Sequence, residues 1–244
     1  YMDNLKTSFG KRKVSSKLKT KLVQGIFTDV ANKYDLMNDL MSLGTHRLWK
    51  KELIEFMNIQ KNDIIIDVGS GTGDLINLIL KKNLKNYIYS VDLNNEMLKY
   101  GKEKFKNKKI KFINNNAEKL NFENDFFDKY IISFCLRNVT NIINALEEAY
   151  RVLKPGGIFY CLEFSTPDTN LIDKMYRNYK RNIIPFIGLK ITKNQKAYKY
   201  LDESIDIFPN QEKLINIMNN VGFKKTNYFN LFNGIVAIHS GFKI

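Results

Sequence analysis

Residues 64–74 read IIIDVGSGTGD, an apolar run that passes through a glycine-rich turn to a carboxylate. A helical pattern follows, with Leu75, Leu78 and Ile79 on one face. The order of strand, glycine turn and helix is typical of α/β folds, which bind ligands at the carboxyl ends of their strands. The stretch therefore predicts a fold class and the place of a site.

The three glycines of this turn, Gly69, Gly71 and Gly73, follow the spacing Gly-x-Gly-x-Gly, whereas dinucleotide-binding loops have Gly-x-Gly-x-x-Gly. No Lys-Ser or Lys-Thr pair follows them, which disfavours a phosphate loop for ATP or GTP. Asp74 stands at the predicted helix N-terminus, where a carboxylate would repel a pyrophosphate. Asp67 and Asp74 would together suit a cofactor with an ammonium and a sulfonium group. The loop thus predicts a nucleotide-like cofactor, with a purely structural turn as the alternative.

The alternation of strands and helices continues along the chain. Pro155 cannot continue a helix, and the two glycines after it permit the turn into the next strand. The pattern predicts a doubly wound, mostly parallel sheet of the Rossmann-like α/β class. Further strands are expected at Tyr87–Val91, Ile110–Ile113, Phe127–Phe134 and Ile158–Phe164, and helices at Asn95–Phe105 and Ile142–Val152.

The segments outside this core complete a single predicted domain. The N-terminal part reads as helical, because apolar residues recur at helical spacing at Leu18, Leu22, Ile26, Phe27 and Val30. The predicted parts are an N-terminal helical cap (1–57), a cofactor-binding core (58–164), a helical insertion (165–209), and a C-terminal helix with an antiparallel hairpin on the sheet edge (210–244).

Polar or small residues stand where three further strands end. Asp92 ends the second strand, at an offset from the glycines where a carboxylate can accept hydrogen bonds from ribose hydroxyls. Asn116 and Ala117 follow the third strand and could contact the adenine of such a cofactor. Ser133 ends the fourth strand, near the place expected for a methionine moiety of the cofactor. Each of these last three could also be an ordinary loop or core residue. Together with the glycine turn, Asp92 supports a cofactor site.

The composition limits the class of protein. Of the 244 residues, 44% are hydrophobic and 26% are charged, which is ordinary for a globular protein. No apolar run approaches the roughly 20 residues of a membrane span. Cys135 and Cys161 lie in apolar strand-like runs, and His46 and His239 are far apart in sequence. We therefore expect neither a disulfide framework nor a metal site.

Basic residues dominate the charge. Lysine and arginine outnumber aspartate and glutamate by 39 to 25, which gives a formal net charge of +14. Such a balance can indicate nucleic acid or an anionic membrane surface as a partner. Lysine and asparagine are abundant along the whole chain, so the alternative is that most lysines are simply solvated.

Several motifs carry a resemblance to a known family. Residues 34–49 read YDLMNDLMSLGTHRLW, and residues 151–157 and 162–167 read RVLKPGG and LEFSTP. Between them, residues 132–140 read ISFCLRNVT. From about Val23 to its C-terminus the chain resembles the ubiquinone/menaquinone biosynthesis C-methyltransferases. Members often have glycine where Cys135 stands, so we expect a narrower pocket with unchanged chemistry.

The resemblance implies a class I methyltransferase fold with S-adenosyl-L-methionine as the cofactor. The implied substrate is a polyprenylated methoxy-benzoquinol in ubiquinone synthesis, or a demethylmenaquinol in menaquinone synthesis. The resemblance implies that the cofactor is contacted by Thr72, Asp92, Asn116, Ala117 and Ser133. We add the loop glycines Gly69, Gly71 and Gly73 to this set of predicted cofactor-binding residues.

Carbon methylation needs an electron-rich ring carbon in line with the sulfonium methyl, so the protein must favour the phenolate form of the quinol. Arg137 is a candidate catalytic residue, because its fixed charge could stabilise a phenolate or polarise a water. Asn138 and Tyr34 could hold that hydroxyl or water. An ordinary salt bridge is the alternative for Arg137, and helix termination is the alternative for Tyr34. His46 is a weaker candidate base.

A prenyl tail requires an apolar surface near a membrane. The stretch Ile183–Leu189, flanked by lysine and arginine, would suit contact with lipid headgroups, and a homodimer contact or a lid is the alternative. Because the chain begins at Tyr1, we expect a trimmed or processed chain, from which a targeting peptide can be missing. We expect a peripheral protein on the matrix face of the mitochondrial inner membrane, with a bacterial-type cytoplasm as the alternative.

Three other functions are alternatives to the predicted quinol methyltransferase. An RNA methyltransferase would suit the charge, but no Asn-Pro-Pro-Tyr type motif or RNA-binding module is present, so no nucleic acid partner is expected. A non-catalytic cofactor-binding subunit in an assembly of quinone-biosynthesis enzymes would bind cofactor without turnover. A nicotinamide oxidoreductase is disfavoured by the glycine spacing and by Asp74.

Overall fold

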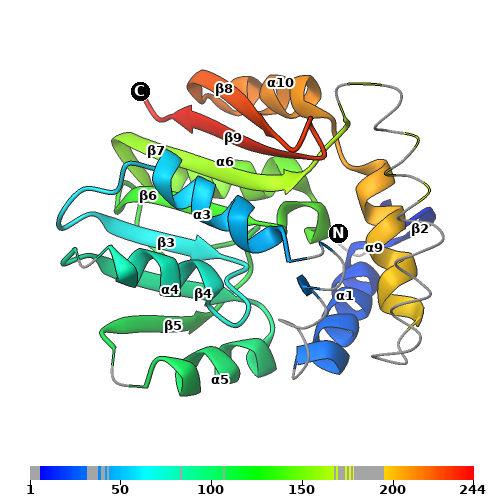
Figure 1. The fold of residues 1–244 in the computed structure, drawn as a ribbon, viewed down its shortest axis with the longest axis horizontal. Coiled ribbons are helices and arrows are strands. Elements are labelled where there is room, and N and C mark those ends of the chain that lie inside the picture. The colour runs from blue at the N-terminus through cyan, green and yellow to red at the C-terminus, as the bar shows by residue number, and fades with distance from the viewer. Residues whose placement is uncertain are drawn as a thin grey trace.

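A seven-stranded sheet forms the centre of the protein in the computed structural model, with the strand order β5-β4-β3-β6-β7-β9-β8 (Figure 1). The structure describes residues 6–31, 38–39, 42, 44–82, 84–106, 108–167, 169, 174, 176, 178 and 195–244. The strands are β3 (Ile64–Val68), β4 (Tyr87–Asp92), β5 (Ile110–Asn114), β6 (Phe127–Ser133), β7 (Leu153–Phe164), β8 (Lys224–Leu231) and β9 (Val236–Phe242). The predicted doubly wound, mostly parallel sheet is confirmed.

The register of the parallel strands brings the predicted site residues to one edge. In β3, Val68 lies opposite Val91 of β4 and Ile132 of β6. The chain leaves all three strands directly after these positions, so the glycine turn, Asp92 and Ser133 lie side by side. The predicted convergence of strand ends therefore follows from the pairing.

Helices cover both faces of the sheet (Figure 1). On one face α3 (His46–Phe56), α4 (Asp74–Lys81) and α5 (Asn95–Lys104) pack over a core that includes Leu53, Ile76 and Ile131. On the other face α6 (Ile142–Val152) and α10 (Gln211–Val221) pack over a core that includes Tyr130, Phe159 and Leu214. Both cores are apolar, as expected for strands buried on two sides.

The C-terminal hairpin is confirmed. β9 pairs antiparallel with β7, with Tyr160 opposite Ser240, and β8 pairs antiparallel with β9 at the sheet edge. Leu231 and Val236 are the last pair of this hairpin, and its connection contains Phe232, Asn233 and Gly234 at positive φ, 47°, 55° and 84°.

The expectation of a wholly helical N-terminal cap is wrong for its first described residues. Lys6–Phe9 (β1) and Arg12–Ser15 (β2) form an antiparallel hairpin that turns at Gly10, whose φ is +56°. The hairpin depends on a distant contact, because the Phe9 ring stacks on Tyr200 at 4.5 Å. No local pattern encodes a contact across such a sequence separation.

Helix α1 (Ser16–Val30) is confirmed, but its inward face differs from the predicted one. Leu18 and Leu22 are exposed, with 44% and 37% of their surface accessible. Lys19 is buried instead, because its ammonium donates to the carbonyl of Val139. Tertiary contacts of polar side chains therefore override the apolar periodicity of this helix.

Two helices far apart in sequence lie together beyond the carboxyl ends of the parallel strands, namely α1 and α9 (Gln195–Ile207) (Figure 1). Helix α9 belongs to the predicted helical insertion, whereas the stretch Ile183–Leu189 lies outside the described residues. No helix in the described part of the chain is both long and apolar enough to cross a membrane.

Candidate functional site

The glycine turn folds back over the end of β4. The amides of Gly69 and Ser70 donate to the carbonyl of Val91 at 2.8 and 3.1 Å. Gly69 has a φ of +69°, and a Cβ at this position would lie 2.2 Å from the sulfur of Cys135. Only glycine fits there, because any side chain would meet both backbone strain and a steric clash.

Asp92 joins this turn to the next strand. Its carboxylate accepts hydrogen bonds from the amides of Gly71 at 2.9 Å and Asn94 at 2.8 Å. Burial raises the pKa of Asp92, while the backbone hydrogen bonds oppose that rise. The carboxylate is thereby fixed at the pocket wall and retains lone pairs for a further donor.

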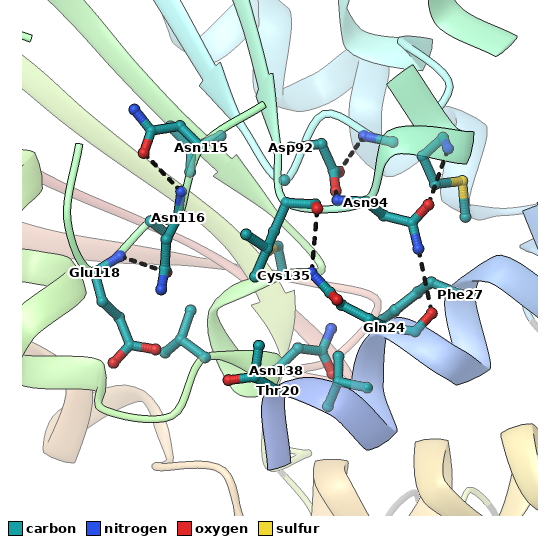
Figure 2. Close-up of a pocket in the computed structure, with 18 of the residues that line it drawn as sticks. Thr20, Gln24, Phe27, Asp92, Asn94, Asn115, Asn116, Glu118, Cys135 and Asn138 are labelled. Atoms are coloured by element: carbon teal, nitrogen blue, oxygen red, sulfur yellow. Dashed lines mark hydrogen bonds between the residues drawn. The ribbon is translucent and has the colours of Figure 1, made fainter. Parts of the chain in front are cut away.

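A pocket opens between this edge of the sheet and α1 (Figure 2). The predicted residues that line it are Gly69, Gly71, Asp92, Asn116, Ala117 and Asn138. Sequence reasoning missed the residues that α1 contributes, which are Thr20, Val23, Gln24 and Phe27. Helical spacing identified the helix but could not show which of its faces would line a pocket.

Hydrogen bonds hold α1 over the pocket. The Gln24 amide donates to the Leu93 carbonyl at 3.2 Å, and the Asn94 amide donates to the Gln24 carbonyl at 3.2 Å. Lys19 donates to the Val139 carbonyl at 2.5 Å, and burial lowers its pKa to about 8 against the opposing charge of Glu118. The helix is thus attached on two sides of the pocket.

A smaller pocket adjoins the glycine turn and contains Thr72 and Ser133 together with Asp67. Asp67 is buried, and burial raises its pKa to about 7, although Lys50 lowers it. One carboxylate oxygen of Asp67 and the hydroxyl of Ser133 make no hydrogen bond to any described residue. Buried polar atoms without partners indicate that a ligand completes this pocket.

Asp74 lines the same pocket as Asp67 but differs from it in carrying two ion pairs. Its carboxylate binds Lys50 at 2.8 Å and Lys104 at 3.2 Å. Burial alone would raise its pKa, but the two lysines outweigh burial and lower the pKa to about 2. That Asp74 serves a cationic cofactor together with Asp67 stays a prediction, and its carboxylate is already paired with two lysines. Gly73 begins α4 and packs on Phe105 rather than lining either pocket.

A third pocket holds two of the predicted catalytic residues, Arg137 and Asn138. The guanidinium of Arg137 binds the carboxylate of Glu163 through contacts of 3.0 and 2.9 Å, and it lies 5.4 Å from the ring centre of Phe164. Glu163 is fully buried. The salt bridge considered as an alternative for Arg137 is thus present, inside a pocket rather than on the surface.

Asn138 connects this pocket to α9. Its side-chain oxygen accepts a hydrogen bond from the hydroxyl of Tyr200 at 3.0 Å. Glu163 and Tyr200 were missed as site residues, because they lie 26 and 62 residues from their partners in sequence. Tyr34 lies outside the described residues. His46 lines the pocket too, 2.9 Å from Asp39, and burial lowers its pKa.

Comparisons with known proteins identify the family. Residues 14–243 match the model of the ubiE/COQ5 methyltransferase family. The chain belongs to the ubiE/COQ5 methyltransferase family. A ubiquinone/menaquinone biosynthesis C-methyltransferase of Rickettsia bellii is 47% identical over 98% of this chain and 99% of its own length. The protein of the same name from Rickettsia prowazekii is 48% identical over the same shares of the two chains.

The fold is also shared with a solved structure. An S-adenosylmethionine-dependent methyltransferase of Thermotoga maritima superposes with a TM-score of 0.64 at 18% identity, over 91% of this chain and all of that one. This likeness concerns the fold alone. Both sequence relatives are bacterial proteins, so they give the expected mitochondrial location no support.

The cofactor of this ubiE/COQ5 family member is S-adenosyl-L-methionine, and the pockets fit it. The unpartnered carboxylate oxygen of Asp67 suits a cationic amino acid moiety, and the fixed carboxylate of Asp92 suits a ribose. Asn116 and Ala117 lie farther along the same pocket as Asp92, where the adenine would follow.

Proposed function

We propose that this chain transfers a methyl group from S-adenosyl-L-methionine to a ring carbon of a polyprenylated methoxy-benzoquinol in ubiquinone biosynthesis. The observation that carries the proposal is that two pockets share lining residues. Phe27, Phe134 and Asn138 line both the pocket with Asp92 and the pocket with Arg137. A donor in the first pocket and an acceptor in the second would therefore meet there.

Bound at this site, the cofactor supplies an electrophilic methyl group on a sulfonium. Asp67, Thr72 and Ser133 would hold its methionine end, and Asp92, Asn116 and Ala117 would hold its nucleoside. Helix α1 covers part of this pocket, and loss of water on binding would strengthen the electrostatic contacts inside it.

Arg137 would favour the phenolate form of the quinol. Its guanidinium has a pKa too high to accept a proton, so it acts as a fixed charge or as a donor to a water that takes the proton. Glu163 fixes its orientation and offsets part of its charge. Asn138, itself held by Tyr200, would bind the ring hydroxyl or that water.

The apolar walls of the acceptor pocket suit an aromatic ring. Ile26, Phe134 and Phe164 line it, together with Ala197 and Leu201 of α9. A prenyl tail would leave from this pocket, so we propose peripheral contact with a membrane. We further propose a cytoplasmic location of the bacterial type, which the bacterial relatives support.

A competition experiment tests the choice of substrate. The protein is incubated with methyl-labelled S-adenosyl-L-methionine and equal amounts of reduced, short-tailed methoxy-benzoquinol and demethylmenaquinol, and the products are quantified by mass spectrometry. We expect the labelled benzoquinol to predominate. Predominant labelling of the naphthoquinol would replace the proposal with menaquinone synthesis. Arg137→Ala should lose the product, and Arg12→Ala, at an exposed arginine that lines none of the described pockets, is its control.

A further inference from the structure

The hairpin of β1 and β2 contacts α9, which is distant from it in sequence (Figure 1). At the hairpin turn, the backbone amide of Lys11 donates to the carboxylate of Glu203 at 3.2 Å, and the Lys11 ammonium lies 3.7 Å from Asp206. On β1, the hydroxyl of Thr7 donates to the carbonyl of Thr140 at 2.8 Å. The hairpin is therefore attached both to α9 and to the loop after β6.

Phe9 extends this attachment to the acceptor pocket. Its ring stacks on the ring of Tyr200, with 4.5 Å between the two centroids and 17° between the two planes. Tyr200 is buried and lines the pocket that contains Arg137. Phe9 is half-buried and is not among the residues that line either ligand pocket. Phe9 thus contacts a pocket residue from outside the pocket.

Tyr200 in turn fixes the side-chain amide of Asn138. Its hydroxyl donates to Oδ1 of Asn138 at 3.0 Å. Burial raises the pKa of Tyr200 well above its ordinary value, although Arg137 lowers it, so the hydroxyl stays protonated and remains a donor. Nδ2 of Asn138 donates to the carbonyl of Phe134 at 3.3 Å. An amide nitrogen carries two hydrogens, so the second is available to the acceptor hydroxyl or a water.

We propose that Phe9 is a positioning residue for methyl transfer, which acts through the ring of Tyr200 to hold the amide of Asn138 toward the acceptor. The inference rests on the proposed function, in which Asn138 binds the ring hydroxyl or the water beside Arg137. A ring stacked on Tyr200 limits its rotation, so its hydroxyl stays on Asn138. Without this stack, the amide loses the donor that fixes the direction of its oxygen and its nitrogen.

Steady-state kinetics of the whole chain with a short-tailed methoxy-benzoquinol are the first arm of the test. Phe9→Ala should lower kcat about fivefold, as the loss of one hydrogen bond would, with the Kd for S-adenosyl-L-methionine within about twofold of the parent. Phe9→Leu keeps the apolar bulk without the flat ring and should behave like Phe9→Ala. Phe9→Tyr keeps the ring and should restore kcat. Arg12→Ala, exposed and opposite Phe9 in the hairpin, is the matched control.

A double-mutant cycle shows whether Phe9 acts through Tyr200. Tyr200→Phe keeps the ring on which Phe9 stacks but removes the hydroxyl that donates to Asn138. In this background, Phe9→Ala should lower kcat by less than about twofold further, because both changes break the same contact. Additive losses in the cycle, an unchanged kcat in Phe9→Ala, or full activity in Phe9→Leu would overturn the proposal. Thermal unfolding confirms that each variant is folded.

NMR of the Asn138 side-chain amide separates failure of this inference from failure of the proposed function. The amide signals are assigned by their loss in Asn138→Ala and are recorded with bound S-adenosyl-L-methionine and without quinol. They should move in Phe9→Ala toward their position in Tyr200→Phe and should stay in place in Arg12→Ala. With that pattern but no methylated quinol, the proposed function fails and the coupling of Phe9 to Asn138 stands. Signals that stay in place in Phe9→Ala would overturn the inference whatever the activity of the parent.

Discussion

Arg137 and Glu163 form a buried ion pair at the wall of the acceptor pocket. Taken alone, such a pair is weak support for stability, because the desolvation of two charges offsets their attraction. Its position suggests another use. The carboxylate holds the guanidinium in one orientation, so that its remaining donors can face a ligand. Glu163 is on this account a positioning residue for Arg137.

Glu163→Gln should therefore lower kcat by about ten- to a hundredfold while the Kd for S-adenosyl-L-methionine stays within about twofold. The variant leaves a buried cation without its partner, so the free energy of unfolding should fall by about 3 kcal/mol. Methyl-transfer kinetics and calorimetry measure both. Glu55→Gln, at an exposed partner of Lys82, is the control. A variant with unchanged kcat would show that the orientation of Arg137 does not matter.

We predict that Asp67 makes cofactor affinity depend on pH near neutrality. Burial raises its pKa to about 7, so the carboxyl group is mostly neutral below that pH and charged above it. A cationic ligand prefers the charged form, so the affinity for S-adenosyl-L-methionine should rise about tenfold between pH 6 and pH 8. Calorimetry across this range tests the prediction. Asp67→Asn should bind more weakly with a flatter profile, and Asp29→Asn should retain the slope of the parent. Equal slopes in parent and Asp67→Asn would contradict it.

Single residues were predictable from sequence where backbone geometry fixes them. The glycine turn and Asp92 follow from the pairing of consecutive parallel strands, which places their ends together whatever the rest of the chain does. Glu163 and Tyr200 act through partners on other elements, and no local pattern marks those pairings. The ion pairs of Asp74 were not predictable either, because sequence does not show that Lys50 and Lys104 approach it.

At the scale of the elements, α1 forms one wall of the cofactor pocket. Thr20, Val23, Gln24 and Phe27 line the pocket, and Gln24 also donates to the loop after β4. The core strands and their helices were predictable because their apolar periodicity is strong and local. The N-terminal hairpin and the inward face of α1 were not, since both depend on contacts with α9 or the loop after β6.

Gln24→Ala should weaken the attachment of α1 over the cofactor pocket. The change removes one hydrogen bond between elements, worth about 1 kcal/mol. The Kd for S-adenosyl-L-methionine should then rise roughly fivefold, chiefly through faster dissociation. Stopped-flow release of the cofactor measures this rate. Lys21→Ala, on the exposed face of the same helix, should release cofactor like the parent. If the two variants release it equally fast, α1 does not retain the cofactor.

At the scale of the whole molecule, His239 links unfolding to pH. It is buried in β9, opposite Cys161 of β7 and Tyr228 of β8. Burial lowers its pKa to about 4. The unfolded chain takes up a proton there below about pH 6.5, whereas the folded chain does not until about pH 4. Stability is therefore fully present above pH 6.5 and is lost as the pH falls toward 4.

Between pH 7.5 and pH 5 this histidine alone should remove about 2 kcal/mol from the free energy of unfolding. Urea unfolding at the two pH values measures the loss. His239→Gln should be less stable at pH 7.5 but should lose about 2 kcal/mol less on acidification than the parent. Should both proteins lose the same amount, the pH dependence would have to come from other groups.

The central claim is that the two pockets which share Phe27, Phe134 and Asn138 carry out methyl transfer to a quinol ring. The most direct test uses S-adenosyl-L-methionine with an isotope-labelled methyl group and a reduced, short-tailed methoxy-benzoquinol, with the label located in the product by mass spectrometry and NMR. The account predicts one labelled methyl on a ring carbon, lost in Arg137→Ala although the cofactor still binds. Cofactor binding without label on any benzoquinol or naphthoquinol would contradict it.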